Sequence, residues 1–119
     1  MAITKAITVD QGTTFEEDFL VHVGVNFPLD LTGYKARMQV RDDFDTNTTR
    51  LNLSNTTGKL IILPVNGKVT ISLVPSDTSG IKFAGPKYKG IYDLEIESPQ
   101  GDVIRVAQGS FTLLREVTR

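Results

Sequence analysis

The stretch Tyr34-Lys35-Ala36-Arg37-Met38-Gln39-Val40-Arg41 alternates apolar and polar residues from end to end. Successive side chains of a β-strand point to opposite faces, so this stretch gathers its apolar residues on one face and its basic and amide residues on the other. One buried face and one wet face are typical of strands in antiparallel sheets. We therefore expect a strand here, with its apolar face in the core.

The same two-residue period recurs along the rest of the chain. It is clearest over residues 68–73 and 92–97, and weaker strands are predicted at 3–9, 15–23, 50–53, 60–63 and 103–114. In the strand 15–23 the side chains expected to point inward are Phe15, Phe19, Val21 and Val23. In the strand 103–114 the apolar phase changes near Gly109, which predicts a β-bulge at that glycine.

Turn residues separate these strands. Asn66-Gly67 fits a tight hairpin because both residue types tolerate positive φ, and residues 99–102 join two strands at hairpin distance. Residues 75–80 indicate one short helical turn. Seven or eight short strands so arranged predict an all-β fold, an immunoglobulin-like antiparallel β-sandwich that forms a single domain over residues 1–119.

Two details follow from that fold. Tyr92 is expected to be the structural tyrosine corner, whose hydroxyl bonds back to the backbone leading into the penultimate strand, with Tyr88 as the competing candidate. The outer faces of two neighbouring strands carry opposite charges, so basic side chains are predicted to face acidic ones across the sheet. The basic set is Lys35, Arg37 and Arg41, and the acidic set is Asp93, Glu95 and Glu97.

The composition excludes several kinds of function. The 119 residues include 13 Lys plus Arg, 14 Asp plus Glu and no Cys, for a net charge of −1. Disulfides, thiol catalysis and thiolate metal sites are excluded, and no excess of basic residues favours nucleic acid. No apolar run is long enough to span a membrane, and the N-terminal stretch MAITKAITVD lacks the apolar segment of a secretory signal. We expect no nucleic-acid partner and no membrane partner.

The residue patterns that support catalysis or metal binding are incomplete. His22 is the only histidine, and acid–base or metal chemistry needs partners held beside it. Asp43, Asp45 and Asn47 have the spacing of a calcium loop, but the sixth position is Thr48 and the twelfth is Ser54, so Asx turns in a solvated loop are expected. The chain is therefore predicted to be no enzyme, with no catalytic residue, cofactor or metal.

Four aromatic residues lie in or beside predicted loops: Phe27, Phe44, Phe83 and Tyr88. Aromatic side chains in loops bring large contact area at low entropic cost, which makes these four candidate partner contacts. The alternative is that they tuck under the ends of the sandwich. The sequence leaves both interpretations open.

Six stretches together resemble a known family. They are residues 7–15, 29–34 with 36–41, 67–73, 92–96, 101–105 and 109–119, which include Leu29-Asp30-Leu31-Thr32-Gly33-Tyr34 and Gly67-Lys68-Val69-Thr70-Ile71-Ser72-Leu73. In this order they resemble a small β-sandwich module of tailed-bacteriophage virions, similar to the N-terminal domains of phage baseplate and fibre proteins, including the upper-baseplate-protein family. The polar stretch 42–65 departs from that pattern and carries an extra strand candidate.

The resemblance implies a non-enzymatic structural protein of the tail, baseplate, neck or fibre. It would be made in the host bacterial cytoplasm and located in the virion, in multiple copies within a symmetric assembly whose partners are other virion proteins. The family offers no catalytic residues to carry over. One alternative is a capsid decoration (cement) protein, and another is a carbohydrate-binding module for host glycans, which the absence of Trp disfavours. Contacts through sheet edges are expected at residues 3–9 and at Phe111-Thr112-Leu113-Leu114.

Overall fold

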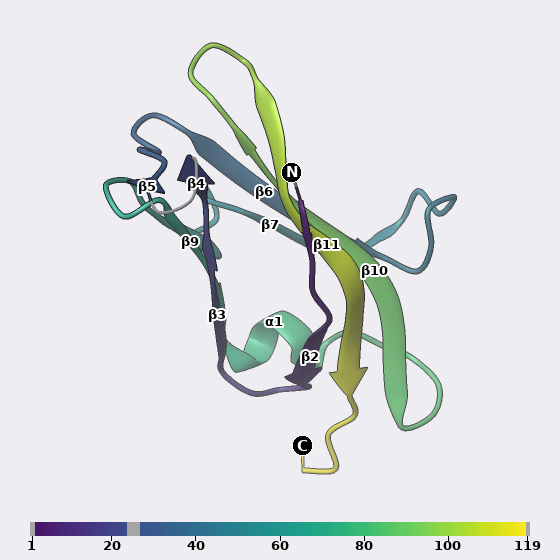
Figure 1. The fold of residues 1–119 in the computed structure, drawn as a ribbon. Coiled ribbons are helices and arrows are strands. Elements are labelled where there is room, and N and C mark those ends of the chain that lie inside the picture. The colour runs from purple at the N-terminus through teal and green to yellow at the C-terminus, as the bar shows by residue number, and fades with distance from the viewer. Residues whose placement is uncertain (1, 24–26, 119) are drawn as a thin grey trace.

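Two β-sheets pack face to face around one core (Figure 1). The computed structural model describes residues 2–23 and 27–118. The larger sheet has six strands in the order β1-β11-β10-β6-β7, with β2 also paired to β11. Its strands are β1 (Ile3–Thr4), β2 (Ile7–Asp10), β6 (Lys35–Arg41), β7 (Thr49–Ser54), β10 (Lys87–Glu97) and β11 (Val103–Leu114).

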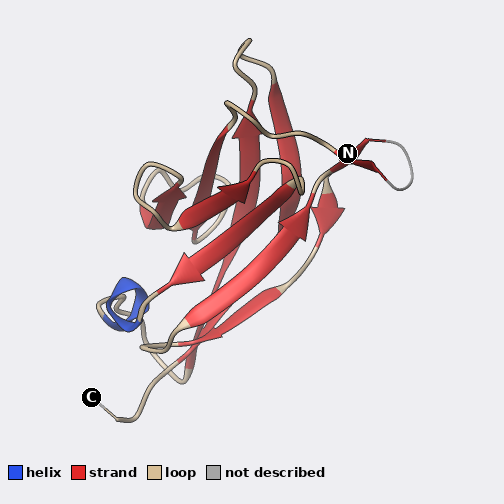
Figure 2. Ribbon diagram, turned by 90° about the vertical axis from the view of Figure 1, so that its left-hand side faces the viewer, coloured by secondary structure: helices blue, strands red, loops and turns tan. Residues whose placement is uncertain are grey.

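The second sheet has three strands in the order β3-β9-β8. They are β3 (Phe15–Leu20), β8 (Leu60–Leu63) and β9 (Lys68–Leu73). The short strands β4 (His22–Val23) and β5 (Phe27–Pro28) form a separate two-stranded ribbon, and the single helix of the described residues, α1 (Pro75–Ser79), follows β9. Figure 2 shows how strands dominate the fold, with α1 at one end.

This strand order is that of an immunoglobulin-like sandwich. The last two strands, β11 and β10, lie side by side with β6, and β7 occupies the place of the extra strand that variable-type domains add to this sheet. The predicted all-β fold and the helical turn near 75–80 are therefore confirmed. One correction concerns strand direction, because β1 and β2 pair with β11 in parallel rather than antiparallel.

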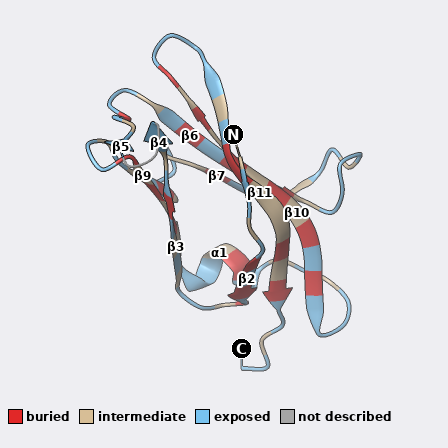
Figure 3. Ribbon diagram, in the orientation of Figure 1, coloured by how far each residue is buried: buried red, intermediate tan, exposed pale blue. Residues whose placement is uncertain are grey.

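The predicted alternation holds along both central strands. In β6 the side chains of Ala36, Met38 and Val40 are buried, and in β10 those of Leu94 and Ile96 are buried. Figure 3 shows buried residues alternating with exposed or intermediate ones along these strands. Apolar side chains of both sheets meet in one cluster, which is the main source of stability for a sandwich of this size.

The first predicted strand, 3–9, is divided in two at Lys5. Lys5 N donates to Gln108 O at 2.9 Å, and Lys5 O accepts a hydrogen bond from the Tyr92 hydroxyl at 2.7 Å. Tyr92 therefore is not a tyrosine corner that bonds back to the chain leading into its own strand, as predicted. The reason is that β10 begins at Lys87, so Tyr92 sits in mid-strand, and its hydroxyl reaches past β11 to the edge segment that contains Lys5.

The predicted bulge lies three residues earlier than Gly109. Leu94 pairs with Ala107 and Glu95 pairs with Arg105, which leaves Val106 as the extra residue. Gly109 pairs regularly with Tyr92 and is needed for another reason. A Cβ on Gly109, at φ +154°, would lie 3.0 Å from the Lys5 carbonyl carbon and closer still to its oxygen.

Charged side chains pair across β6 and β10 only at one end. Arg37 donates to Glu95 at 3.1 Å and to Glu97 at 2.8 Å, as predicted. At the other end the register of the two strands places Arg41 opposite the uncharged Ile91 and Asp93 opposite the uncharged Gln39, so among these described residues no ion pair forms across β6 and β10.

Three smaller predictions were wrong. The turn at Asn66-Gly67 is a four-residue loop between β8 and β9 in which only Gly67 has positive φ, at +61°. The strand 15–23 ends at Leu20, and Val23 is exposed in β4 because the chain leaves the small sheet there. The stretch 111–114 lies inside the sheet between β10 and β2, so it offers no free edge.

Candidate binding groove

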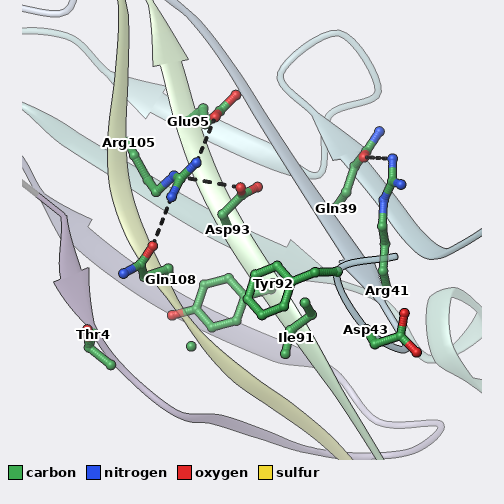
Figure 4. Close-up of a pocket in the computed structure, with 12 residues that line it drawn as sticks. Thr4, Gln39, Arg41, Asp43, Ile91, Tyr92, Asp93, Glu95, Arg105 and Gln108 are labelled. Atoms are coloured by element: carbon green, nitrogen blue, oxygen red, sulfur yellow. Dashed lines mark hydrogen bonds and ion pairs between the residues drawn. The ribbon is translucent and has the colours of Figure 1, made fainter. Parts of the chain in front are cut away.

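A groove of about 520 Å³ crosses the outer face of the six-stranded sheet (Figure 4). Its floor is formed by outward-facing side chains of β10 and β11, and its sides by β1, β6 and the loop that follows β6. The lining side chains include Gln39, Arg41, Phe44, Ile91, Asp93 and Gln108. Sites of this size, about 300–1,000 Å³, are typical of small-molecule binding.

One row of polar side chains runs across the groove from strand to strand. Gln39 of β6 pairs with Asp93 of β10, and Asp93 pairs with Gln108 of β11. Thr4 of β1 pairs with Gln108 and completes the row. Neighbouring strands lie about 4.8 Å apart, so the row is a ladder of an amide, a carboxylate, an amide and a hydroxyl at that spacing.

Two arginines hold the glutamines of this row in place. Arg105 Nη1 donates to Gln108 Oε1 at 3.0 Å, and Arg41 Nη2 donates to Gln39 Oε1 at 2.9 Å. Arg105 also lies 3.7 Å from an oxygen of Asp93. Both carbonyl oxygens are thus occupied, and neither glutamine NH₂ group bonds to another described residue.

The loop after β6 forms one rim of the groove. Asp43 Oδ1 accepts hydrogen bonds from Asp45 N at 3.0 Å, from Thr46 N at 2.9 Å and from Thr46 Oγ1 at 2.7 Å. The bond from the Thr46 hydroxyl is the main reason that the pKa of Asp43 is lowered. Arg41 Nη1 also donates to Thr46 O at 2.9 Å. This is the predicted Asx-turn loop, and it presents the Phe44 ring to solvent with 89% of its surface exposed.

The base of the same loop is fixed by Tyr88. Its hydroxyl donates to Asp42 Oδ1 at 2.8 Å, and Arg50 Nε donates to the same oxygen at 2.9 Å while its guanidinium lies 5.1 Å from the centre of the Tyr88 ring. The hydrogen bond from Arg50, followed by that from Tyr88, lowers the pKa of Asp42. Burial and the nearby carboxylate raise the pKa of Tyr88.

The four candidate contact aromatics divide into two pairs. Tyr88 is only 7% exposed, because its position in β10 has the inward phase of the core residues, so it was wrongly predicted as a partner contact. Phe83 packs against it with ring centres 5.9 Å apart and is partly buried, which is the alternative of tucking under the end of the sandwich. Phe44 and Phe27, the latter 73% exposed, remain free for contact.

Exposed apolar side chains gather at the end of the sandwich where β4 and β5 lie. The hydrogen bonds from Val21 N to Gly67 O at 2.7 Å and from Leu29 N to Val21 O at 2.9 Å bring that ribbon against the turn after β8. We call the exposed set here the apolar end: Leu20, Val23, Phe27, Ile61, Leu63 and Val65. Leu20, Ile61 and Leu63 alternate with more buried residues along β3 and β8, so these three face outward from the small sheet.

Other chemistry is sparse in the described part of the chain. Residues 2–23 and 27–118 contain no group of three or more His, Cys, Asp or Glu side chains placed to hold a metal ion. His22 is exposed in β4. Among the same residues, no helix combines the length and apolar character needed to cross a bilayer.

Comparisons with known proteins concern the fold alone. No family model and no curated protein matches the chain. Murine CRIg is similar at 12% sequence identity and a TM-score of 0.39, covering 93% of this chain and 92% of that one. Tim-1 is similar at 11% and 0.39 over 100% and 97% of the two chains, and the CooA pilin subunit from enterotoxigenic Escherichia coli at 10% and 0.39 over 98% and 92%. Likenesses this distant carry no argument about function, and the fold assignment rests on the strand order.

The sequence did not single out the groove residues Gln39, Arg105 and Gln108. Their only signal was an outward phase in their strands, which any solvated face shares. Phe44 was singled out as a loop aromatic, and the structure places it on the rim of the groove.

Proposed function

We propose that this chain is a non-enzymatic structural module of a tailed-phage virion, used in the tail, baseplate, neck or fibre. The observation that carries the proposal is the apolar end, an exposed apolar surface on a small sandwich whose framework carries the resemblance described above. The partner is another protein subunit of the particle. Exposed apolar clusters on soluble domains mark contact surfaces, and burying one Phe or Leu contributes about 1.5–3 kcal/mol.

The stretches that carry the resemblance build the scaffold of the sandwich. Leu31 is buried, and Asp30 Oδ1 accepts hydrogen bonds from Thr32 N at 3.0 Å and from Thr32 Oγ1 at 2.6 Å. Tyr34 N donates to Leu31 O at 3.0 Å, so this turn directs the chain into β6. A resemblance located in buried and turn residues concerns the module as a building unit, which supports a structural role rather than catalysis.

The residues of the apolar end come from several structural elements, so together they form a surface broad enough to contact another protein. Leu63 lies in β8, Val65 in the turn that follows it and Phe27 in β5, a ribbon strand that backbone hydrogen bonds bring against that turn. Lys68 lies between Leu20 and Leu63 in the sheet, and its amine is 3.8 Å from Asp18, so charged groups are interspersed with the apolar residues there. Protein–protein contacts outside permanent complexes are of this mixed kind, with an apolar fraction close to that of the rest of the surface.

The test is incorporation into particles. The wild-type chain is expected among the proteins of purified virions by mass spectrometry, and imaging with an antibody should place it on the tail apparatus. Phe27→Ser combined with Val65→Ser should abolish incorporation while leaving the fold intact, because both side chains are exposed. The control is Val117→Ser, at an exposed position beyond β11 and at the other end of the molecule from β4 and β5 (Figure 1).

Two results would overturn the proposal. One is absence of the chain from purified particles although it is abundant in the producing cells. The other is normal incorporation of the double variant at the apolar end. Labelling of the capsid shell instead of the tail would favour the alternative role of a decoration protein.

A further inference from the structure

The floor of the groove offers side chains and no free backbone. β6, β10 and β11 are each paired on both sides, so their N–H and C=O groups are already bonded within the sheet. A peptide that adds to a sheet needs an unpaired edge, and none is exposed at this floor. A ligand in this groove is therefore recognised by side chains alone.

The positive and negative charges that line the groove nearly cancel, and the arginine side chains already contact neighbouring groups of the protein. Arg41 and Arg105 are set against Asp43, Asp93 and Glu95. Arg105 is already directed toward Gln108, Asp93 and Glu95, at 3.0, 3.7 and 4.0 Å respectively. A polyanion would meet the carboxylate at the centre of the row and a cation would meet the two guanidinium groups, so the lining favours an uncharged ligand.

Hydrogen-bonding groups in the row alternate between donors and acceptors. The NH₂ groups of Gln39 and Gln108 are donors, and they flank the carboxylate of Asp93, which only accepts. A hydroxyl group both donates and accepts, so a ligand with adjacent hydroxyls can bond to a carboxylate and an amide at once. Because the arginines hold both glutamine oxygens, little side-chain ordering remains to be lost on binding.

Apolar surface lies beside this polar row. Ile91 is partly exposed on the floor, directly across from Arg41, and Phe44 stands on the rim with its ring almost entirely in solvent. The loop that carries Phe44 is held by the hydrogen bonds to Asp43 and by Arg41, so the ring is presented from a fixed support. A ligand that combines hydroxyls with an apolar C–H face would use both surfaces.

We propose that this groove binds a neutral saccharide, with the Phe44 ring against a sugar face and the Gln39, Asp93 and Gln108 side chains bonded to sugar hydroxyls. The site is independent of the apolar end, because it lies on the outer face of the other sheet. The chain can thus bind a glycan whether or not it is assembled into a particle.

The experiment is a nuclear magnetic resonance titration of the full chain with four neutral disaccharides: maltose, cellobiose, lactose and diacetylchitobiose. At least one is expected to bind with a Kd of about 1 mM or tighter, and to shift backbone amide signals of residues 39–46, 91–95 and 105–109. Phe44→Ala should weaken that binding about tenfold, since it removes the aromatic contact. Gln108→Ala should weaken it about fivefold, since it removes one donor of the row.

Phe27→Ala is the matched control, because it removes an exposed aromatic ring on the other sheet's side of the molecule and should leave the affinity unchanged. Equal weakening by Phe27→Ala and Phe44→Ala would overturn the proposal. So would the absence of shifts at about 10 mM of all four disaccharides, or shifts in the groove with 3′-sialyllactose but with none of the neutral sugars. Absence of the wild-type chain from purified virions, with saccharide binding intact, would count against the proposed function only.

Discussion

Tyr92→Phe tests the contact that joins the middle of the larger sheet to its edge. The substitution removes one oxygen from a buried ring and deletes the 2.7 Å hydrogen bond to the Lys5 carbonyl. A net loss of about 1–2 kcal/mol is expected, since a typical hydrogen bond contributes about 1 kcal/mol and the carbonyl of Lys5, itself half-buried, loses its partner. For a domain of this size that corresponds to a fall of roughly 3–8 °C in Tm.

The assay is equilibrium urea unfolding followed by far-ultraviolet circular dichroism. Tyr34→Phe is the control, because the Tyr34 ring also packs against the core while its hydroxyl bonds to no described residue. The control should stay within about 0.5 kcal/mol of wild type. A loss as large in Tyr34→Phe as in Tyr92→Phe, or no loss in either, would refute the assignment of the stabilising effect to the Lys5 contact.

Gly109→Ala extends the same argument to a coupled pair. The added methyl group would collide with the Lys5 carbonyl and displace it from the Tyr92 hydroxyl. The two substitutions therefore act through one carbonyl, and the double variant should be less destabilised than the sum of the singles by at least about 0.5 kcal/mol. Strict additivity would show that Gly109 and Tyr92 act on different contacts.

Three further predictions use other parts of the sheet. Glu95→Lys should lower the free energy of unfolding by about 0.5–1.5 kcal/mol, because it places a third cation beside Arg37 and Arg105. The surface is partly exposed, so thermal unfolding should show a smaller effect at high salt than at low salt. Burial, followed by the charge of Glu17, raises the pKa of Tyr92 to about 12. This folded-state pKa lies above the unfolded value of about 10, so its contribution to stability is complete below pH 10 and is lost as the pH rises toward 12. The urea midpoint of Tyr92→Phe should therefore decline less steeply than that of the wild type over this pH range. Leu94→Ala should cost about 2–5 kcal/mol, because Leu94 is fully buried between β6 and β11, and an unchanged urea midpoint would contradict its place at the centre of the core.

The parts of the fold that the sequence predicted are those set by local period. Alternation over 34–41 and 92–97 was sufficient to place Met38 and Leu94 in the core, because side-chain direction in a strand depends only on position along it. The failures came where one strand meets another. The extra residue at Val106 depends on how β11 pairs with β10, and no local pattern distinguishes Val106 from Gly109 as the place of the bulge.

Tyr88 and Tyr92 illustrate the same limit for single residues. Both lie at inward phases of β10, but the strand starts earlier than the apolar pattern indicated, at Lys87. The Tyr88 side chain consequently points into the core instead of toward solvent, and the Tyr92 hydroxyl meets Lys5, 87 residues away in the chain. Long-range partners of this kind follow from the pairing of the sheets, which composition and spacing do not specify.

The groove is the clearest case of a site that exists only in the folded chain. Gln39, Asp93, Gln108 and Thr4 come from four separate strands, and each by itself is an ordinary outward-facing polar residue. They form a row because the registers of β6, β10, β11 and β1 coincide at that level of the sheet. The bulge at Val106 contributes directly, because regular pairing continued from Glu95 and Arg105 would place Ala107 rather than Gln108 opposite Asp93. Deleting Val106 removes only this unpaired residue and leaves Gln108 opposite Asp93, so a folded deletion variant should retain saccharide binding. Gln108→Ala in the same background should weaken that binding, because it removes a donor of the row itself. Equal affinity of the deletion variant with and without Gln108→Ala would show that the row does not form the site.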